Sequence, residues 1–238
     1  MANLHPTTDD LSIQPWLSRC AYPLARYLVL PAYFGKIRIE GRENIPTDGP
    51  VIVAPTHRSR WDGVLVPYAV GRIASGRDPH FMVSADEMKG IQGWAIRQFG
   101  GFPVDLSRAG LLNSIRTSVE LLEQGKMLTV FPEGGIFRTP DVQPLKPGVA
   151  RMAVQAQNQR GAIAPSVKVL PVSMQYTQEF PSWGSQVHIN IGEPLDVASY
   201  NLETLKTASK QLTEDLKLAL ETLNGQHTVA PASLETVA

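Results

Sequence analysis

The stretch Val51–Gly63, VIVAPTHRSRWDG, decides the fold because the chain changes from strand to helix within it. Its first residues, Val51–Ala54, form a short apolar run that is typical of a buried strand. Proline and threonine then leave the strand, and the chain from Trp61 onward is typical of a helix. A strand, a loop and a helix in this order indicate one unit of a parallel α/β sheet.

The same alternation continues along the chain and predicts an α/β fold, with a mainly parallel central sheet flanked by helices. The predicted strands are short and apolar: Lys36–Glu40, Val51–Ala54, His80–Val83, Gly101–Val104, Met127–Phe131, Val167–Val172 and Val187–Ile191. The predicted helices are longer: Asp62–Ala74, Asp86–Gln98, Ala109–Gln124, Gly148–Gln159 and a last, amphipathic helix over Leu202–Leu223.

The composition is that of one α/β domain with a sizeable core, since 43% of the 238 residues are hydrophobic and 18% are charged. Lys plus Arg and Asp plus Glu both number 22, so the net charge does not point to nucleic acid as a partner. The single Cys20 excludes an internal disulfide, and no Cys/His cluster has the spacing of a zinc site. We therefore expect an intracellular protein without a metal.

The N-terminal part lacks the features of a signal peptide, and no run reaches the roughly 18 to 20 apolar residues that cross a bilayer. The protein is therefore expected to be neither secreted nor membrane-spanning. The segment Trp16–Phe34 is nonetheless aromatic and apolar, with two arginines as its only charged residues. From these residues alone, it is either a helix in a membrane interface or a pair of helices packed on the core.

His57 follows the predicted strand directly, and Asp62 lies five residues later near the start of the next helix. A neutral imidazole accepts a proton from an attacking alcohol through Nε2 if a carboxylate holds its Nδ1–H group, and Asp62 is placed to do so. The chain has no G-x-S-x-G motif, so the alcohol is expected to belong to the substrate. In the alternative interpretation, His57 only stabilises the loop.

His5 and Asp10 have the same spacing but no strand before them, and we regard them as coincidence.

Polar residues also follow the next predicted strands, where ligands of α/β sheets gather. Ser107 is a candidate helix N-cap, and Arg108 stands where a helix N-terminus and a guanidinium together bind an anion such as phosphate. Glu133 enters a glycine turn, where it would bind substrate hydroxyls or anchor a nearby arginine. Arg138 and Lys146 follow, and Lys146 is a further candidate phosphate contact.

Four motifs in this order resemble those of the glycerolipid acyltransferase family, and above all its bacterial and plastid 1-acyl-glycerol-3-phosphate acyltransferases. The resemblance covers roughly residues 45 to 194. The motifs are His57-x-Ser59-x-x-Asp62, Gly101 to Arg108, Phe131-Pro132-Glu133-Gly134, and Leu170-Pro171-Val172.

The resemblance implies that His57 is the general base and that Asp62 orients it. It implies transfer of an acyl chain from acyl-ACP or acyl-CoA to lysophosphatidic acid, giving phosphatidic acid, with no cofactor beyond that co-substrate. The residues that it places at the substrate are Ser59, Arg108, Glu133, Gly134, Gly135, Arg138 and Lys146.

The resemblance also favours the membrane interpretation of the N-terminal segment. The expected organisation is a tail and helical membrane-docking segment (1–35), an acyltransferase domain (36–225) and a flexible tail (226–238), in a peripheral protein on the cytoplasmic face of the membrane. Three alternatives remain. They are an acyltransferase for another lysolipid or glycerol 3-phosphate, a thioesterase-like hydrolase in which His57 activates water, and a non-catalytic lipid-binding protein.

Overall fold

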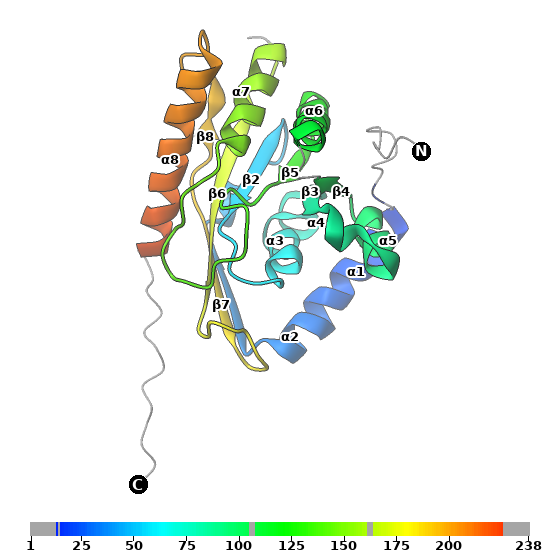
Figure 1. Ribbon diagram of the computed structural model, residues 1–238. Coiled ribbons are helices and arrows are strands. Elements are labelled where there is room, and N and C mark those ends of the chain that lie inside the picture. Colours follow the sequence, from blue (N-terminus) through cyan, green and yellow to red (C-terminus); the bar gives the residue numbers. More distant parts are fainter. Residues whose placement is uncertain (1–12, 14, 105–107, 161–163, 226–238) are drawn as a thin grey trace.

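The computed structural model describes residues 13, 15–104, 108–160 and 164–225, and its centre is an eight-stranded sheet in the order β1-β7-β6-β2-β5-β3-β4, with β8 also paired to β6 (Figure 1). All neighbours are parallel except that β6 is antiparallel to β7 and β8. The predicted mainly parallel sheet is confirmed. The strands are β1 (Lys36–Glu40), β2 (Val51–Pro55), β3 (Pro79–Ser84), β4 (Gly101–Val104), β5 (Met127–Thr129), β6 (Lys168–Tyr176), β7 (Gln186–Ile191) and β8 (Leu195–Asp196).

Helices cover both faces of the sheet. On one face lie α6, α7 and α8, and on the other lie α3 and the N-terminal helices (Figure 1). The α-helices are α1 (Pro15–Leu24), α2 (Leu30–Tyr33), α3 (Asp62–Val70), α4 (Arg72–Ser75), α5 (Gly90–Gln98), α6 (Arg108–Glu123), α7 (Gly148–Arg160) and α8 (Leu205–Gly225). A π-helix, η2 (Ala25–Val29), joins α1 to α2, and the 3₁₀ helices are η3 (Arg42–Asn44), η4 (Ala85–Met88) and η5 (Val197–Ser199).

The strand that precedes His57 separates two hydrophobic cores. Successive side chains of a strand point to opposite faces. Accordingly, Val51 and Val53 pack with α3, while Ile52 and Ala54 pack with α7 and α8. All four side chains are fully buried. A strand buried on both faces is held firmly, so the loop that leaves it starts from a fixed point.

Three elements near the site differ from the sequence-based prediction. The helix predicted over Asp62–Ala74 is broken at Gly71, where the backbone is extended, so that α3 and α4 are separate. The strand predicted to end at Val172 continues as β6 to Tyr176, because the antiparallel partner β7 pairs with this extension. The predicted strand Met127–Phe131 ends at Thr129.

The predicted helical segment at the N-terminus is present as α1, η2 and α2. It is attached to the sheet by Leu30 and Phe34, which are 0% and 3% exposed. Trp16, Tyr27 and Leu28 are instead 64%, 74% and 60% exposed. In the part of the chain that the structure describes, no helix has the length and apolar character that crossing a membrane requires. The predicted tail 226–238 lies outside the described residues.

Candidate active site

The site forms where three neighbouring strands end. His57 follows β2, Glu133 follows β5, and Tyr176 is the last residue of β6. Because β2 lies between β5 and β6, these three residues come to the same edge of the sheet. Ligands of open α/β sheets bind at the carboxyl ends of the strands.

The predicted pair of His57 and Asp62 is in contact. Nδ1 of His57 lies 2.9 Å from Oδ2 of Asp62, which belongs to the first turn of α3. The Asp62 side chain is fully buried, whereas that of His57 is 17% exposed. Among the residues that the structure describes, none hydrogen-bonds the second ring nitrogen, Nε2. The imidazole is therefore anchored at one nitrogen and available at the other.

Asp62 accepts hydrogen bonds at both carboxylate oxygens. The backbone N–H groups of Arg58 and Ser59 donate to Oδ2 over 2.6 and 2.8 Å, and the hydroxyl of Tyr176 donates to Oδ1. An ionised carboxylate only accepts, so the geometry assigns the shared proton to Nδ1 of His57. This leaves the lone pair on Nε2, as a general base requires.

The plane of the His57 ring is also fixed. The ring stacks on Phe131, with centroids 3.9 Å apart and an interplanar angle of 18°. The backbone carbonyl of His57 accepts from the N–H group of Phe137 over 2.8 Å, which ties the loop after β2 to the loop after β5. Stacking and hydrogen bonding together hold the imidazole in one orientation.

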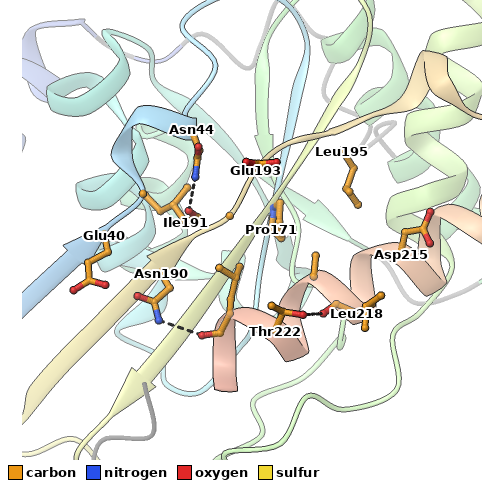
Figure 2. A pocket seen from close by; sticks show the side chains of 14 residues that line it. Glu40, Asn44, Pro171, Asn190, Ile191, Glu193, Leu195, Asp215, Leu218 and Thr222 are labelled. Carbon is orange, nitrogen blue, oxygen red and sulfur yellow. Dashed lines mark hydrogen bonds between the residues drawn. The ribbon is translucent and has the colours of Figure 1, made fainter. Parts of the chain in front are cut away.

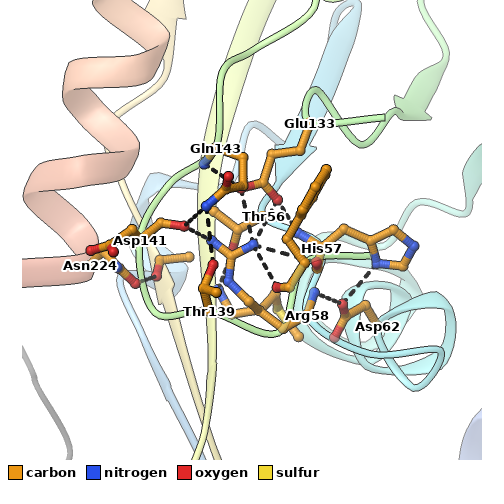
Figure 3. Close-up of polar contacts among 12 residues, drawn as sticks. Thr56, His57, Arg58, Asp62, Glu133, Thr139, Asp141, Gln143 and Asn224 are labelled. Carbon is orange, nitrogen blue, oxygen red and sulfur yellow. Dashed lines mark hydrogen bonds and ion pairs between the residues drawn. The ribbon is translucent and has the colours of Figure 1, made fainter. Parts of the chain in front are cut away.

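A buried ion pair stands beside the dyad (Figure 3). Nη1 of Arg58 lies 3.0 and 2.7 Å from the two carboxylate oxygens of Glu133, and both side chains are almost completely buried. The N–H groups of His57 and Gln143 also donate to Glu133, over 2.8 and 2.9 Å. Of the two roles considered for Glu133, anchoring a nearby arginine is the one that corresponds to an observed contact.

The guanidinium of Arg58 holds the surrounding loop as well. It donates to the carbonyl oxygens of Phe137 and Asp141, over 3.2 Å in each case. Figure 3 shows the Arg58 and His57 side chains extending in different directions from adjacent backbone positions. Arg58 thus holds the buried loops together, while the neighbouring His57 side chain is partly exposed.

The other residues predicted to bind substrate lie in different surroundings. Gly134 has a φ of +72°, and a Cβ built there would lie 2.4 Å from Nζ of Lys146, so the exposed Lys146 lies over the glycine turn. Arg138 is exposed, with its guanidinium 4.6 Å from the ring centroid of Phe180 in the β6–β7 loop. Gly135 contacts Phe137, whose ring lies 3.4 Å from a built Cβ.

Of three further predicted positions, Ser59 is fully described, whereas Arg108 and Ser107 lie at or outside the limits of the described residues. Ser59 is buried within the loop, where its backbone supports Asp62 and its Oγ accepts from the N–H group of Trp61 over 3.3 Å. Arg108 is the first residue of α6, and its side chain lies outside the described part of the chain. Ser107, the predicted N-cap, also lies outside it.

Sequence reasoning missed Tyr176 and Arg58. The signal for Tyr176 was the alternation of apolar and polar residues in Val172–Tyr176, a pattern that predicts a continued strand. Arg58 gave no comparable signal, because its partner is separated from it by 75 positions and is brought near only by the pairing of β2 with β5.

A hollow lies away from these residues, between β6, β7 and α8 (Figure 2). Its volume is about 670 Å³, and its lining includes the carboxylates Glu40, Glu193 and Asp215. None of the residues predicted to form the active site lines it.

The chain is similar to known proteins in sequence. Residues 36–175 match the family described as Acyltransferase. The chain is 28% identical over 200 residues to the 1-acyl-sn-glycerol-3-phosphate acyltransferase of Bacillus subtilis (strain 168), covering 81% of this chain and 90% of that protein. It is 27% identical over 209 residues to the 1-acyl-sn-glycerol-3-phosphate acyltransferase of Streptococcus pneumoniae, covering 82% and 70%.

The fold is also similar to a solved structure. The crystal structure of the 1-acyl-sn-glycerophosphate (LPA) acyltransferase PlsC from Thermotoga maritima aligns with a TM-score of 0.61 at 26% sequence identity, covering 82% of this chain and 74% of that one. The family match includes more than half of the chain, with the ends of β2 and β5 and all of β6 except its last residue, Tyr176. The protein is an enzyme that belongs to the acyltransferase family.

Proposed function

We propose that the protein is a peripheral membrane enzyme that moves an acyl chain from an acyl thioester, acyl-ACP or acyl-CoA, to the free hydroxyl of 1-acyl-glycerol-3-phosphate, giving phosphatidic acid. The observation that carries the proposal is the His57 imidazole, held by Asp62 at Nδ1 and unpartnered by the described residues at Nε2. The relatives named for this reaction support the choice of acceptor.

The proposed reaction needs no covalent enzyme intermediate. The substrate hydroxyl attacks the carbonyl carbon of the thioester while Nε2 of His57 takes the hydroxyl proton. The new C–O bond forms, the C–S bond breaks, and the imidazolium returns the proton to the departing thiolate. General-base help of this kind typically contributes about 10² to 10⁴ in rate, and holding alcohol and thioester together adds a further contribution.

We propose that positive charge near the glycine turn binds the phosphate of the acceptor. Lys146 is exposed and lies over Gly134, and Arg138 is exposed further along the same loop. Arg108 begins a sixteen-residue helix, where the N-terminal dipole favours an anion. Glu133 acts in this proposal through Arg58, by fixing the loop that carries these groups.

We propose that the α1–α2 segment lies on the cytoplasmic face of a membrane, from which the enzyme takes its lipid substrate. The segment exposes Trp16, Tyr27 and Leu28 on helices that the buried Leu30 attaches to the sheet. Aromatic and apolar side chains exposed in this way are typical of helices that lie in a membrane interface.

The proposal is tested by acyl transfer in detergent micelles, with labelled acyl-ACP and acyl-CoA as donors and lysophosphatidic acid, glycerol 3-phosphate and other lysolipids as acceptors. We expect phosphatidic acid from wild type and its loss in His57→Ala, with circular dichroism showing that the variant is folded. Transfer only to another acceptor would change the proposed substrate. Free fatty acid without transfer would indicate a hydrolase, and no turnover of any donor would indicate a lipid-binding protein.

A further inference from the structure

The second oxygen of the Asp62 carboxylate has one donor among the described residues, the hydroxyl of Tyr176. We infer that Tyr176 is a positioning residue of the dyad: its hydroxyl fixes the rotation of the Asp62 carboxylate, and through it the orientation of His57. The kinetic part of this inference rests on the proposed acyl transfer, and the structural part does not.

Burial makes this donor important. The Asp62 side chain is fully buried, and a buried carboxylate oxygen without a donor is costly. Oδ2 has three partners, namely the two backbone N–H groups of Arg58 and Ser59 and the imidazole of His57. Without the Tyr176 hydroxyl, all donors that the structure describes would bond to Oδ2. Oδ1 would then have none of them, and the rotation of the carboxylate would no longer be fixed at both oxygens.

Tyr176 is itself held from several directions. Its backbone pairs with Val187 in β7, which fixes the end of β6. Its ring lies 6.4 Å, between centroids, from the buried ring of Phe34, which in turn lies 5.2 Å from the ring of Trp61. Trp61 directly precedes Asp62. The donor and the acceptor are therefore positioned by the same group of aromatic residues.

The hydroxyl remains a donor at every pH at which the protein would be assayed. Burial, and next the neighbouring Asp62 carboxylate, raise the pKa of Tyr176 well above its usual value. Because the phenol does not ionise, it cannot become a second negative charge beside the carboxylate. Tyr176 thus keeps the proton that it donates to Asp62.

The first test is Tyr176→Phe, which removes the hydroxyl and keeps the ring. Tyr176 acts through Asp62, so we expect kcat to fall roughly 10-fold, the size expected for a lost hydrogen bond to a charged group, with little change in KM. The matched control is Tyr200→Phe, which removes a 2.8 Å tyrosine–carboxylate hydrogen bond to Asp215, a residue of α8. We expect wild-type kinetics for the control. An unchanged kcat in Tyr176→Phe, or a rise in KM alone, would overturn the inference.

The second test needs no turnover. The proton between Nδ1 of His57 and Oδ2 of Asp62 is expected to give a low-field ¹H resonance, which His57→Gln would identify by its loss. Tyr176→Phe should shift or broaden this resonance, and Tyr200→Phe should leave it in place. An unaltered resonance in folded Tyr176→Phe would overturn the positioning role. If wild type shows the resonance but turns over no thioester, the proposed function fails while this test still decides the role of Tyr176.

A double-mutant cycle separates action through Asp62 from direct contact with substrate. In the Asp62→Asn background, Tyr176→Phe should cause little further loss of kcat. If the two residues acted independently, the fold-losses in kcat of the two substitutions would multiply. If Tyr176→Phe does not fold, Phe34→Leu takes its place, because it loosens the tyrosine ring and keeps the hydroxyl. A smaller loss of kcat with a broadened resonance is then expected, and wild-type values for both would overturn the inference.

Discussion

Arg58 and Glu133 show, at the scale of single residues, how much of the site is built to hold its neighbours. Two charges buried side by side are stable only as a pair, because each is costly alone. Their contact crosses 75 sequence positions and adds a backbone donor from His57 itself. The pair therefore connects the loop after β2 to the loop after β5. Its removal should lower the stability of the fold more directly than it lowers catalytic activity.

We predict that Glu133→Ala lowers the free energy of unfolding by about 3 to 5 kcal/mol, because Arg58 would stay buried without a counter-charge. Urea denaturation measures this loss. The control is Glu120→Ala, which removes the exposed partner of Arg116 in α6 and should cost at most about 1 kcal/mol. Equal losses in the two variants would contradict the buried-pair account.

His80 gives a prediction for the pH dependence of stability. Burial, and next the charge of Lys126, lower the pKa of His80 from 6.5 to about 4. Above pH 6.5 the histidine is neutral in both the folded and the unfolded chain. Between pH 6.5 and pH 4 only the unfolded chain takes up the proton, so the free energy of unfolding falls as the pH falls, by about 2 kcal/mol at pH 5.

His80→Gln should remove this component of the pH dependence. The measurement is the free energy of unfolding of wild type and variant at pH 7 and pH 5. Wild type should lose about 2 kcal/mol more than the variant between these two values. The same pH dependence in both proteins would show that the histidine is solvated in the folded state.

The contact of His57 with Asp62 was predictable because both residues lie in one strand-to-helix loop. The predicted order of strand, loop and helix and the short spacing of the two residues were sufficient to predict this contact. The contacts of Glu133 with Arg58 and of Asp62 with Tyr176 were not, since the sequence does not state which strands lie beside β2. Contacts of this kind depend on strand order, and strand order is a property of the completed sheet.

At the scale of elements, the sequence predicted the strands and helices more reliably than their ends. Short apolar runs located β1 to β7, while β8, with two residues, is too short to produce a pattern. The extension of β6 was missed because Ser173 and Gln175 interrupt the apolar run, although their alternation with Met174 and Tyr176 suits a strand with two different faces. The missed extension contains the donor to Asp62.

Gly71 separates α3 from α4 for a steric reason. A Cβ at this position would lie 2.3 Å from the backbone oxygen of Pro67 and 2.8 Å from the hydroxyl of Tyr22. We predict that Gly71→Ala lowers the free energy of unfolding by about 1 to 3 kcal/mol, because the backbone must shift to admit the methyl group. Thermal and urea denaturation measure the effect.

Gly63, in the first turn of α3, provides the control. A Cβ there has no atom within 4 Å, so Gly63→Ala should stabilise the protein by about 0.5 to 1 kcal/mol. The two substitutions add the same methyl group and should act with opposite signs. Changes of the same sign would show that the break at Gly71 is not set by the lack of space.

On the scale of the whole molecule, the exposed apolar residues of the N-terminal helices should determine where the enzyme works. We predict that Leu28→Glu weakens binding to anionic lipid vesicles at least 10-fold, because burying one leucine contributes about 1.5 to 3 kcal/mol. Leu28 is 60% exposed, and Leu218 in α8 is 64% exposed. Leu218→Glu is therefore a matched control, expected to bind as wild type does.

Vesicle sedimentation measures both variants, with transfer to a lysolipid in micelles as a second readout. Equal weakening by the two substitutions would mean that α1 and α2 have no special part in membrane binding. The sequence could indicate this segment by its aromatic content, but not which side of it faces the sheet. That side is defined by Leu30 and Phe34, whose burial depends on contacts with distant strands.

The residues that support the dyad come from distant strands, and this has a consequence for the order in which the enzyme folds. Asp62 meets Tyr176 across 114 positions of the chain, and His57 meets Glu133 across 76. Closing such long loops is slow compared with forming helices. During refolding or synthesis, helices should thus form early, before β2 pairs with β6. The recovery of turnover would then report the time at which β2 and β6 pair. A nascent chain that ends before β6 would contain helices but would be inactive.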